Sequence, residues 1–302
     1  MSLIVTGSIG IDSIEAPTGN VDDVLGGSSI YFAAAASFFG PVRLVGAVGE
    51  DFPPNFLETF RHFDIDLAGL ETRAGSQTFR WRGRYHENMN DRDTISVELN
   101  VLAEDLPPVP DSYRDSKYIF LANTHPDAQM ALLEQFPEHE LVVADTMDLW
   151  IENERPALVK LLEKIDGLVL NDSEAFQFTG KTNLVQAAES ILAHGPTFVV
   201  IKKGEHGAFL MHKEGIGALP AFAARDVVDP TGAGDSFAGG MMGYLAAAGD
   251  HSLDALRKAI AYGTVVASYN IESFSLDRMK RIDRQAIDDR LKQFSDMLVI
   301  GP

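Results

Sequence analysis

The residues best suited to chemistry lie between Asp229 and Gly240, in the run Asp-Pro-Thr-Gly-Ala-Gly-Asp-Ser-Phe-Ala-Gly-Gly. The first half of this run is too rich in glycine to form a helix interior, and Pro230 favours an extended conformation at Asp229. From Asp235 onward apolar residues recur at helical spacing, so a turn of small residues leads directly into a helix. Unpaired N–H groups of such a turn lie at the positive end of the helix dipole, which makes a site for an anion such as phosphate.

Asp235 adds a possible catalytic group to this anion site. A carboxylate beside phosphate weakens simple binding, but it can take the proton from an attacking hydroxyl group. The amides of Gly232, Ala233 and Gly234 would then stabilise the charge that builds up on a transferred phosphoryl group. The alternative is structural, because Asp is also a common N-cap after a glycine-rich turn. The residues alone leave both interpretations open.

The run from Asp229 to Asp235 resembles the C-terminal signature of the ribokinase-like (PfkB) family of carbohydrate and nucleoside kinases. The resemblance implies that Asp235 is the catalytic base, that the Gly232–Gly234 amides form the anion hole, and that Thr231 lies at the nucleotide. It also implies ATP as phosphoryl donor, Mg²⁺, and a monovalent cation such as K⁺ at carbonyls that flank the Asp229 turn.

Composition limits the class of protein. With 302 residues and 45% hydrophobic residues, the chain can form one large α/β domain or two modest ones. No apolar run approaches the ~20 residues of a membrane span, and the N-terminus is typical of a first strand and not of a signal peptide. The absence of cysteine fits a reducing cytoplasm, and the net charge of −19 argues against nucleic-acid binding. We therefore expect a cytoplasmic protein that binds small molecules.

Strands and helices alternate along most of the chain. Apolar runs at Leu3–Ile9 and Val42–Val48 are each followed by a helical pattern, which indicates a parallel sheet with crossover helices. Further strands are predicted at 117–122, 141–144, 167–170 and 197–201, and further helices at 127–136, 253–269 and 284–294. The pattern and the resemblance together predict a three-layer α/β/α sandwich with a mostly parallel central sheet, formed by residues 1–302 as a single domain.

Residues 72–100 interrupt this alternation. Phe79–Tyr85 and Thr94–Leu99 alternate at period two around a polar turn, as in an antiparallel hairpin with one wet face. Such an insertion is a candidate lid. Each of its polar residues Arg82, Arg84, Asn88 and Asn90 would either reach substrate or lie on a hairpin face turned to solvent. The resemblance implies that strands from about residues 13–25 complete a small β-sheet lid and that the lid forms a homodimer.

The acceptor side of the predicted site lies near the first helix. Asp12 follows the first strand, at the edge where ligands of open α/β sheets bind, although a turn facing solvent is the alternative. The resemblance implies that Asp12 holds substrate hydroxyl groups and that Gly26 and Gly27 form a substrate-binding turn. Many family members carry Asn where this chain has Tyr31, which argues against a ribokinase-type substrate. The Tyr31 ring would stack on a sugar or pack.

Asn123 and Asp145 end two further predicted strands at the same edge, so they are also candidate substrate-binding residues. The sequence after Asp145 lacks the Asn and Arg with which some relatives grip an acidic sugar. An acidic sugar is therefore a less favoured substrate.

The nucleotide side of the site depends mainly on the resemblance. Asn171 and Glu174 share the first turn of a helix, where they form a capping box, match the family motif that organises Mg²⁺ and phosphate through water, or do both. Lys202 offers positive charge to a triphosphate. The remaining nucleotide-binding candidates are Gly204, Gly207 and Ser268.

We therefore expect a kinase that transfers the γ-phosphoryl group of ATP to a hydroxyl group of a sugar or sugar-like substrate. The alternatives are a nucleoside kinase, in which Tyr31, Trp81 and Tyr85 stack on the base, and a non-catalytic relative that binds sugar or nucleotide. An oxidoreductase is disfavoured, because Gly7-Ser-Ile-Gly10 lacks the complete dinucleotide fingerprint.

Overall fold

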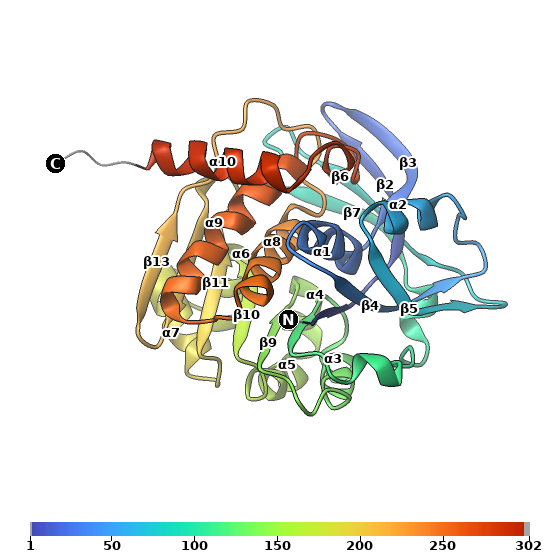
Figure 1. Ribbon diagram of the computed structural model, residues 1–302, viewed down its shortest axis with the longest axis horizontal. Helices are drawn as coiled ribbons and strands as arrows, with labels where there is room; N and C mark the ends of the chain where they lie inside the picture. Colours follow the sequence, from blue (N-terminus) through green and yellow to red (C-terminus); the bar gives the residue numbers. More distant parts are fainter. Residues whose placement is uncertain (1, 299–302) are drawn as a thin grey trace.

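Two β-sheets of different size organise the chain in the computed structural model, which describes residues 2–298 (Figure 1). The large sheet has the strand order β13-β12-β11-β10-β9-β8-β1-β4-β5. Its strands are β1 Leu3–Thr6, β4 Val42–Gly49, β5 Ile65–Arg73, β8 Tyr118–Leu121, β9 Leu141–Asp145, β10 Gly167–Asn171, β11 Phe198–Lys202, β12 Ala208–His212 and β13 Gly215–Leu219. In this order, each strand from β11 to β5 is parallel to its neighbours, whereas β12 pairs antiparallel with β11 and β13 pairs antiparallel with β12 at one edge. Residues that follow the parallel strands therefore meet along one edge of the sheet.

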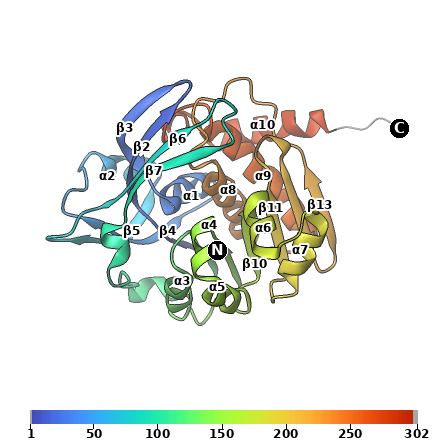
Figure 2. The same ribbon diagram turned by 180° about the vertical axis from the view of Figure 1, so that it is seen from behind.

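Helices cover both faces of the large sheet. The face toward the viewer in Figure 1 carries α1 Ser28–Ser37, α2 Phe56–His62, α8 Ala233–Ala248, α9 Leu253–Asn270 and α10 Arg284–Met297. The opposite face, in front in Figure 2, carries α3 Pro126–Leu133, α4 Asp148–Asn153, α5 Arg155–Leu162, α6 Asp172–Thr179 and α7 Leu184–Leu192. Successive strand residues point to opposite faces, so Val5 packs in one apolar core and Ile4 in the other.

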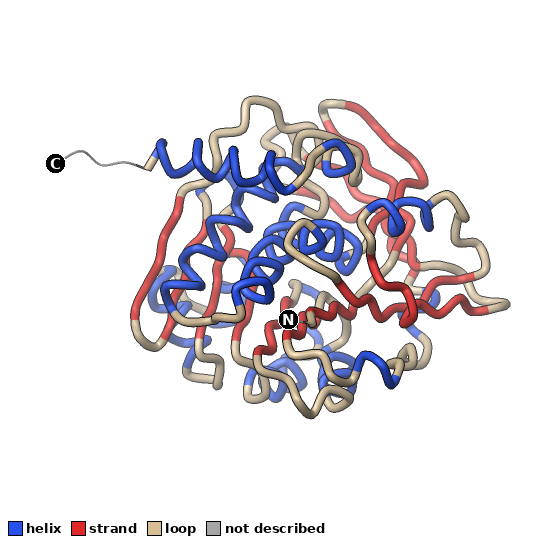
Figure 3. Tube along the Cα trace, in the orientation of Figure 1, coloured by secondary structure: helices blue, strands red, loops and turns tan. Residues whose placement is uncertain are grey.

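The predicted three-layer sandwich with a mostly parallel sheet is confirmed, and Figure 3 shows the strands between the two groups of helices. Short 3₁₀ turns occur at η1 Asn100–Ala103, η2 Asp111–Tyr113, η3 Gly204–His206 and η4 Met279–Arg281. Among the helices of residues 2–298, none is both long and apolar enough to cross a membrane.

Helices α1 and α8 approach each other closely because glycine lies at their contact. A Cβ atom on Gly239 would lie 2.2 Å from the carbonyl oxygen of Phe32, and one on Gly243 would lie 3.0 Å from the Cα atom of Ala36. Any larger residue at Gly239 would push the helices apart. The seam therefore fixes the beginning of α8 relative to the beginning of α1.

The small sheet has the order β3-β2-β6-β7, with β2 Gly10–Ala16, β3 Gly19–Gly26, β6 Phe79–Tyr85 and β7 Arg92–Glu98. The predicted antiparallel hairpin is confirmed as β6 and β7, although β7 begins at Arg92. Strand β2 pairs antiparallel with β3 and parallel with β6. Residues 72 and 73 end β5 and thus belong to the large sheet.

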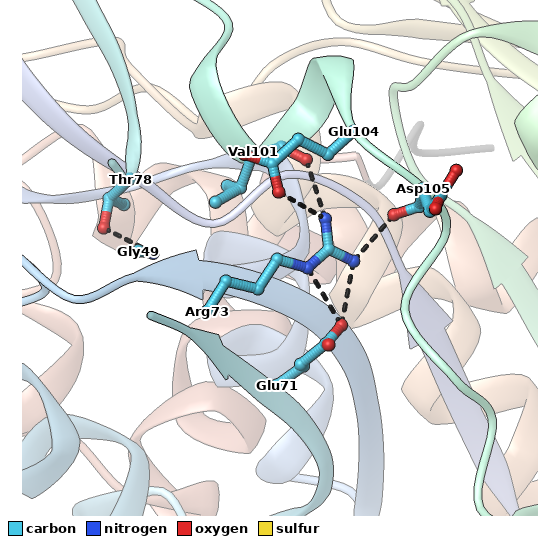
Figure 4. A network of polar contacts seen from close by, with 7 residues as sticks. All are labelled: Gly49, Glu71, Arg73, Thr78, Val101, Glu104 and Asp105. Carbon is cyan, nitrogen blue, oxygen red and sulfur yellow. Dashed lines mark hydrogen bonds and ion pairs between the residues drawn. The ribbon is translucent and has the colours of Figure 1, made fainter. Parts of the chain in front are cut away.

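Polar contacts attach both ends of the β6–β7 hairpin to the large sheet. At the end of β5, Arg73 Nη1 donates to the carbonyl oxygen of Val101 at 3.3 Å and Nη2 to that of Asp105 at 2.6 Å (Figure 4). Before β6, the Thr78 hydroxyl accepts a hydrogen bond from the Gly49 N–H at 3.0 Å. The hairpin is therefore held at its base, and its tip extends away from these contacts.

Candidate active site

A cavity of about 1260 Å³ lies between the small sheet and the carboxyl edge of the large sheet. This volume exceeds the ~300–1,000 Å³ of a typical small-molecule pocket, so it has room for two molecules. The predicted site residues that line the cavity are Asp12, Gly27, Tyr31, Asn123, Asp145, Asn171, Glu174, Lys202, Gly204, Thr231, Gly232, Ala233, Gly234 and Asp235. The structure thus brings residues from the two ends of the chain to one place.

The glycine turn begins α8 as the sequence predicts. Gly232 is the N-cap residue with φ +73°, a left-handed conformation that favours glycine, and Asp235 lies in the first turn of the helix. A Cβ atom on Gly232 would lie 2.2 Å from Cγ of Tyr31. The Tyr31 ring is only 1% exposed, so of its two predicted roles the structure shows packing, directly beneath the turn.

Three contacts hold Thr231, the residue before the turn. Its N–H donates to Asp229 Oδ1 at 2.9 Å, and its carbonyl oxygen accepts from Asn270 Nδ2 at 2.7 Å. Its hydroxyl donates to the hydroxyl of Tyr85 on β6 at 3.2 Å. The last contact brings the inner face of the small sheet against the glycine turn.

Asp12 lies on β2 and is 4% exposed, which rules out the solvent-facing turn considered from sequence. The N–H of Gly27 faces its carboxyl group, while Asp12 Oδ1 has no hydrogen-bond partner among the described residues. A Cβ atom on Gly26 would lie 1.9 Å from Asp12 Oδ2. Gly26 therefore supports Asp12 and does not itself line the cavity.

Asn171 and Glu174 form a capping box at the start of α6. Asn171 Oδ1 accepts from the Glu174 N–H at 2.8 Å, and Glu174 Oε2 accepts from the Asn171 N–H at 2.7 Å. The structural interpretation is therefore correct, and it is compatible with a ligand role because both side chains also line the cavity.

Lys202 ends β11 beside the glycine turn. Its Nζ atom lies 2.7 Å from the position of a Cβ atom on Gly234, and it has no ion pair within residues 2–298. Gly204, with φ +51°, begins the turn that follows. Gly207 lies behind that turn and outside the cavity, with φ +87° and a Cβ position 2.1 Å from the carbonyl oxygen of Leu219.

Two predicted residues have their polar atoms occupied by other groups. The Ser268 hydroxyl donates to the carbonyl oxygen of Val265 at 2.7 Å and accepts from Arg290 at 3.0 Å, which holds it in α9 outside the cavity. Asn123 lines the cavity, but its Oδ1 accepts from Trp150 Nε1 at 2.8 Å. Asn123 therefore orients the Trp150 ring.

A family model described as pfkB family carbohydrate kinase matches residues 17–279. The chain belongs to the PfkB family. It is 28% identical over 248 residues to a cytidine kinase of Thermococcus kodakarensis, covering 80% of this chain and 87% of that protein. A nucleoside kinase of Methanocaldococcus jannaschii is 22% identical over 232 residues, covering 76% and 73%. PfkB membership makes the protein a phosphotransferase with a hydroxyl acceptor.

A solved structure shows the same PfkB fold. Aminoimidazole riboside kinase from Salmonella enterica, complexed with aminoimidazole riboside and an ATP analog, superposes with a TM-score of 0.77 at 20% identity, over 96% of this chain and 100% of that one. The ribokinase-like fold predicted from sequence is therefore confirmed.

Acidic groups crowd this PfkB site and alter one another's ionisation. Burial raises the pKa of Asp235 to about 6, although nearby Lys202 and Arg92 counteract part of the effect. Burial, together with Asp229 and Asp235, raises the pKa of Asp12 to about 8. Burial also raises the pKa of Asp145 well above its usual range, with a contribution from Asp235. Shifts of this kind are typical of functional sites.

For Arg82 and Arg84, the structure shows the second of the two expected placements, on the outer face of the hairpin. Arg82 and Arg84 both bind Glu15, on the face away from the cavity. Arg92, which the sequence placed in a polar turn, begins β7 and lines the cavity. Side chains alternate between the two faces of the hairpin, and the register pairs Arg92 with Tyr85, so the two side chains share the face toward the cavity. This register is the signal that would have found Arg92.

Proposed function

We propose that the protein transfers the γ-phosphoryl group of ATP to a hydroxyl group of a nucleoside. The observation that carries the proposal is that Asp12, Asp235 and the Gly232–Gly234 turn line one cavity. An acceptor held by Asp12 at one end would present its hydroxyl group to Asp235 and the glycine amides at the other.

A nucleoside is favoured over a free sugar by the walls of this cavity. Trp81, Tyr85 and Trp150 line it, and aromatic rings of this kind stack on flat groups such as a nucleobase. The relatives named cytidine kinase and nucleoside kinase support the same choice. Asp12 Oδ1 has no hydrogen-bond partner among the described residues, and the pKa of about 8 keeps the carboxyl group protonated near neutral pH before a ligand binds. Hydroxyl groups of a bound ribose that donate to it would favour its ionised form, which accepts hydrogen bonds from two neighbouring hydroxyl groups.

Different residues of the chain would have separate roles in the reaction. Asp235 takes the proton of the attacking hydroxyl group, which requires its ionised form. The amides of the glycine turn and the nearby Lys202 stabilise negative charge on the phosphoryl group. Closure of the small sheet over the cavity, as a lid, would exclude water as a competing acceptor.

Magnesium would be held mainly by the nucleotide. Among residues 2–298 no cluster of three or more His, Cys, Asp or Glu side chains is arranged to hold a metal ion. Glu174 fits a role through water, because only one of its carboxylate oxygens is used by the capping box. When bound, Mg²⁺ neutralises charge on the β- and γ-phosphates.

A monovalent cation fits beneath the Thr231 turn, and K⁺ is expected to stabilise the protein. Asp229 Oδ2 and Asn270 Oδ1 are buried and lack hydrogen-bond partners within the described chain, and both residues bind Thr231. At K⁺ tenfold above its dissociation constant, linkage adds about 1.4 kcal/mol to the free energy of unfolding, so Tm rises by a few degrees. Thermal unfolding in KCl and in choline chloride measures this. An equal Tm in both salts, or an undiminished K⁺ effect in Asp229→Asn, would contradict the prediction.

We also propose that the protein is a homodimer through the small sheet. β7 is its edge strand and exposes Ile95, which is 44% accessible. Light scattering is expected to give twice the 32.9 kDa of one chain, and Ile95→Lys is expected to give a single chain. A wild-type mass of one chain at micromolar concentration would rule the dimer out.

The proposed function is tested with an acceptor panel. Protein, ATP, Mg²⁺ and K⁺ are incubated with purine nucleosides, pyrimidine nucleosides, free pentoses, hexoses or a cyclitol, and phosphorylated products are identified by mass spectrometry. A nucleoside monophosphate is the expected product. Product from free sugars alone would replace the nucleoside assignment, and no product from any acceptor would favour a non-catalytic nucleotide-binding protein.

A further inference from the structure

The cavity face of strand β7 changes in character along its length. Arg92 begins the strand, Val97 lies near its end and Leu99 just after it, and all three line the cavity. Arg92 pairs with Tyr85, whose hydroxyl contacts Thr231, so the charged end of this face is the end at which phosphoryl transfer is proposed. The opposite end of the face is apolar.

A row of side chains across the small sheet leads from the proposed acceptor site to this apolar end. Asp12 on β2 pairs with Trp81 on β6, and Trp81 pairs with Val97 on β7. Side chains of directly paired residues lie on the same face of a sheet, and all three residues line the cavity. Neighbouring strands lie ~4.8 Å apart, so the backbone of Val97 is about 10 Å from that of Asp12 along this row. Ribose hydroxyl groups at Asp12 therefore place the base near Trp81 and the far edge of the base toward Val97.

Large apolar side chains gather past this point although they are exposed. Val97, Leu99 and Leu106 are 48%, 44% and 41% accessible, and Leu102 lies between the last two in the chain. All four line the cavity, and together they are called the apolar end. Exposed apolar groups that gather beside a cavity are typical of a surface that binds a ligand.

Polar contacts hold the backbone of this stretch in place. Arg73 donates to the carbonyl oxygens of Val101 at 3.3 Å and Asp105 at 2.6 Å (Figure 4). Asn100 Nδ2 donates to the carbonyl oxygen of Thr78 at 2.8 Å, and Asn100 has φ +46°, a left-handed conformation that turns the chain and that few residues other than glycine adopt. The leucine side chains of the apolar end are thus presented by a fixed segment and not by a loose loop.

We propose that the apolar end is a subsite for an apolar substituent on the base of the acceptor, so that the protein phosphorylates nucleosides alkylated on their exocyclic amine. The inference rests on the proposed function and narrows its substrate class. In the step, the acceptor oxygen forms a bond to the γ-phosphorus while the bond from that phosphorus to the bridging oxygen breaks. ADP leaves with the electron pair of the broken bond, and Asp235 receives the proton of the acceptor hydroxyl group.

The substituent takes no part in this step and contributes binding alone. The exocyclic amine of adenine or cytosine lies on the side of the base far from the ribose. A group attached there continues the row past Val97 toward Leu99 and Leu102. Each methylene group that it buries raises affinity by a factor of about four. A carboxylate at the same position would lose its hydration without gaining a partner among apolar groups.

The test uses adenosines and cytidines that carry a methyl, propyl, pentyl or carboxypentyl group on the exocyclic amine. KM and kcat are measured at saturating ATP. Binding without ATP is measured by tryptophan fluorescence, because Trp81 and Trp150 are the two tryptophans of the chain and both line the cavity. For at least one base, KM is expected to fall by about tenfold or more from the unsubstituted to the pentyl compound, while kcat stays within about threefold. The carboxypentyl compound is expected to lose this gain.

Leu99→Asn and Leu106→Asn are compared with Ile216→Asn. Ile216 is an exposed apolar residue of β13 that lies outside the cavity. In the two cavity variants the KM values of the unsubstituted and pentyl compounds are expected to differ by less than about threefold, whereas Ile216→Asn should keep the wild-type preference.

A KM that does not fall with alkyl length, an equal fall for the carboxypentyl compound, or a pentyl preference that survives in both cavity variants would overturn the subsite and leave the nucleoside kinase assignment in place. If no nucleoside is phosphorylated but affinity still rises with alkyl length, the proposed function fails and the subsite stands. If no nucleoside binds, both are rejected. Light scattering tests a second copy as the occupant: if Leu99→Asn converts a wild-type dimer into single chains, another protomer covers the apolar end and the subsite is rejected.

Discussion

Asp235→Asn is expected to lower kcat by ~10²–10⁴-fold while ADP binds with near-normal affinity. The amide is almost the same size as the carboxyl group, so the start of α8 and the Gly232–Gly234 amides remain in place, but it cannot accept the proton of the attacking hydroxyl group. Steady-state kinetics for turnover and calorimetry for ADP binding separate these two effects.

The pH dependence of turnover gives a second test of the role of Asp235 as the base. Because burial raises the pKa of Asp235 to about 6, its basic form is lost as the pH falls through that value, and turnover of the wild type should fall with it. Asp254→Asn is a matched control, since Asp254 also lies in the first turn of a long helix but binds Arg257 at the surface. Near-normal turnover in Asp235→Asn, or the same loss in Asp254→Asn, would end the assignment of Asp235 as base.

Asp12→Asn is expected to weaken acceptor binding by ~10²-fold and to leave the KM for ATP almost unchanged. Hydrogen bonds to a charged group contribute about 1.5–3 kcal/mol each, and the amide replaces an oxygen that accepts from a substrate hydroxyl group with a group that donates. The KM values for acceptor and ATP, measured separately, test this. Equal rises in both would indicate a structural effect.

The same variant is expected to be more stable than wild type at alkaline pH. Burial raises the folded-state pKa of Asp12 from 3.8 to about 8, so between these values the folded protein holds a proton that the unfolded chain has lost. Wild-type stability therefore declines as the pH rises through this range, and the advantage of Asp12→Asn in Tm should grow from pH 5.5 to pH ~8.5. Asp22→Asn, on the exposed part of β3, is the control and should show no such trend. A Tm difference that is constant with pH would contradict the prediction.

The large sheet could be predicted because its signals are local. Most of its buried strands are short apolar runs followed by a helical pattern, so the runs Leu3–Ile9 and Val42–Val48 located β1 and β4, although β1 ends at Thr6. The strands β5 and β13 were not predicted. The sequence signals for the β6–β7 hairpin were also local. The parallel pairing of β2 with β6 was not, because it joins residues about 70 positions apart, and the family resemblance implied only that strands from about residues 13–25 complete the lid.

The site was predictable where chemistry and backbone coincide. The glycines of the turn from Gly232 to Asp235 indicate its conformation, and the helical pattern after them indicates that the turn begins a helix. Arg92 was missed because its direction depends on the register of the hairpin, and Ser268 was included although its direction depends on how α9 packs beneath Arg290. The type of a residue does not tell which way its side chain points.

The seam between α1 and α8 has a mechanical consequence. The loop at Gly27 and the turn at Gly232 begin two helices that touch through Gly239, and the Tyr31 ring fills the space between helix α1 and that turn. If the two substrates bind as proposed, the residues beneath both belong to one packed unit, and the spacing between the two binding sites is fixed when the chain folds and not by rotation of two domains about a hinge. In the proposed mechanism the small sheet, and not this packed unit, would open and close over the cavity in each catalytic cycle.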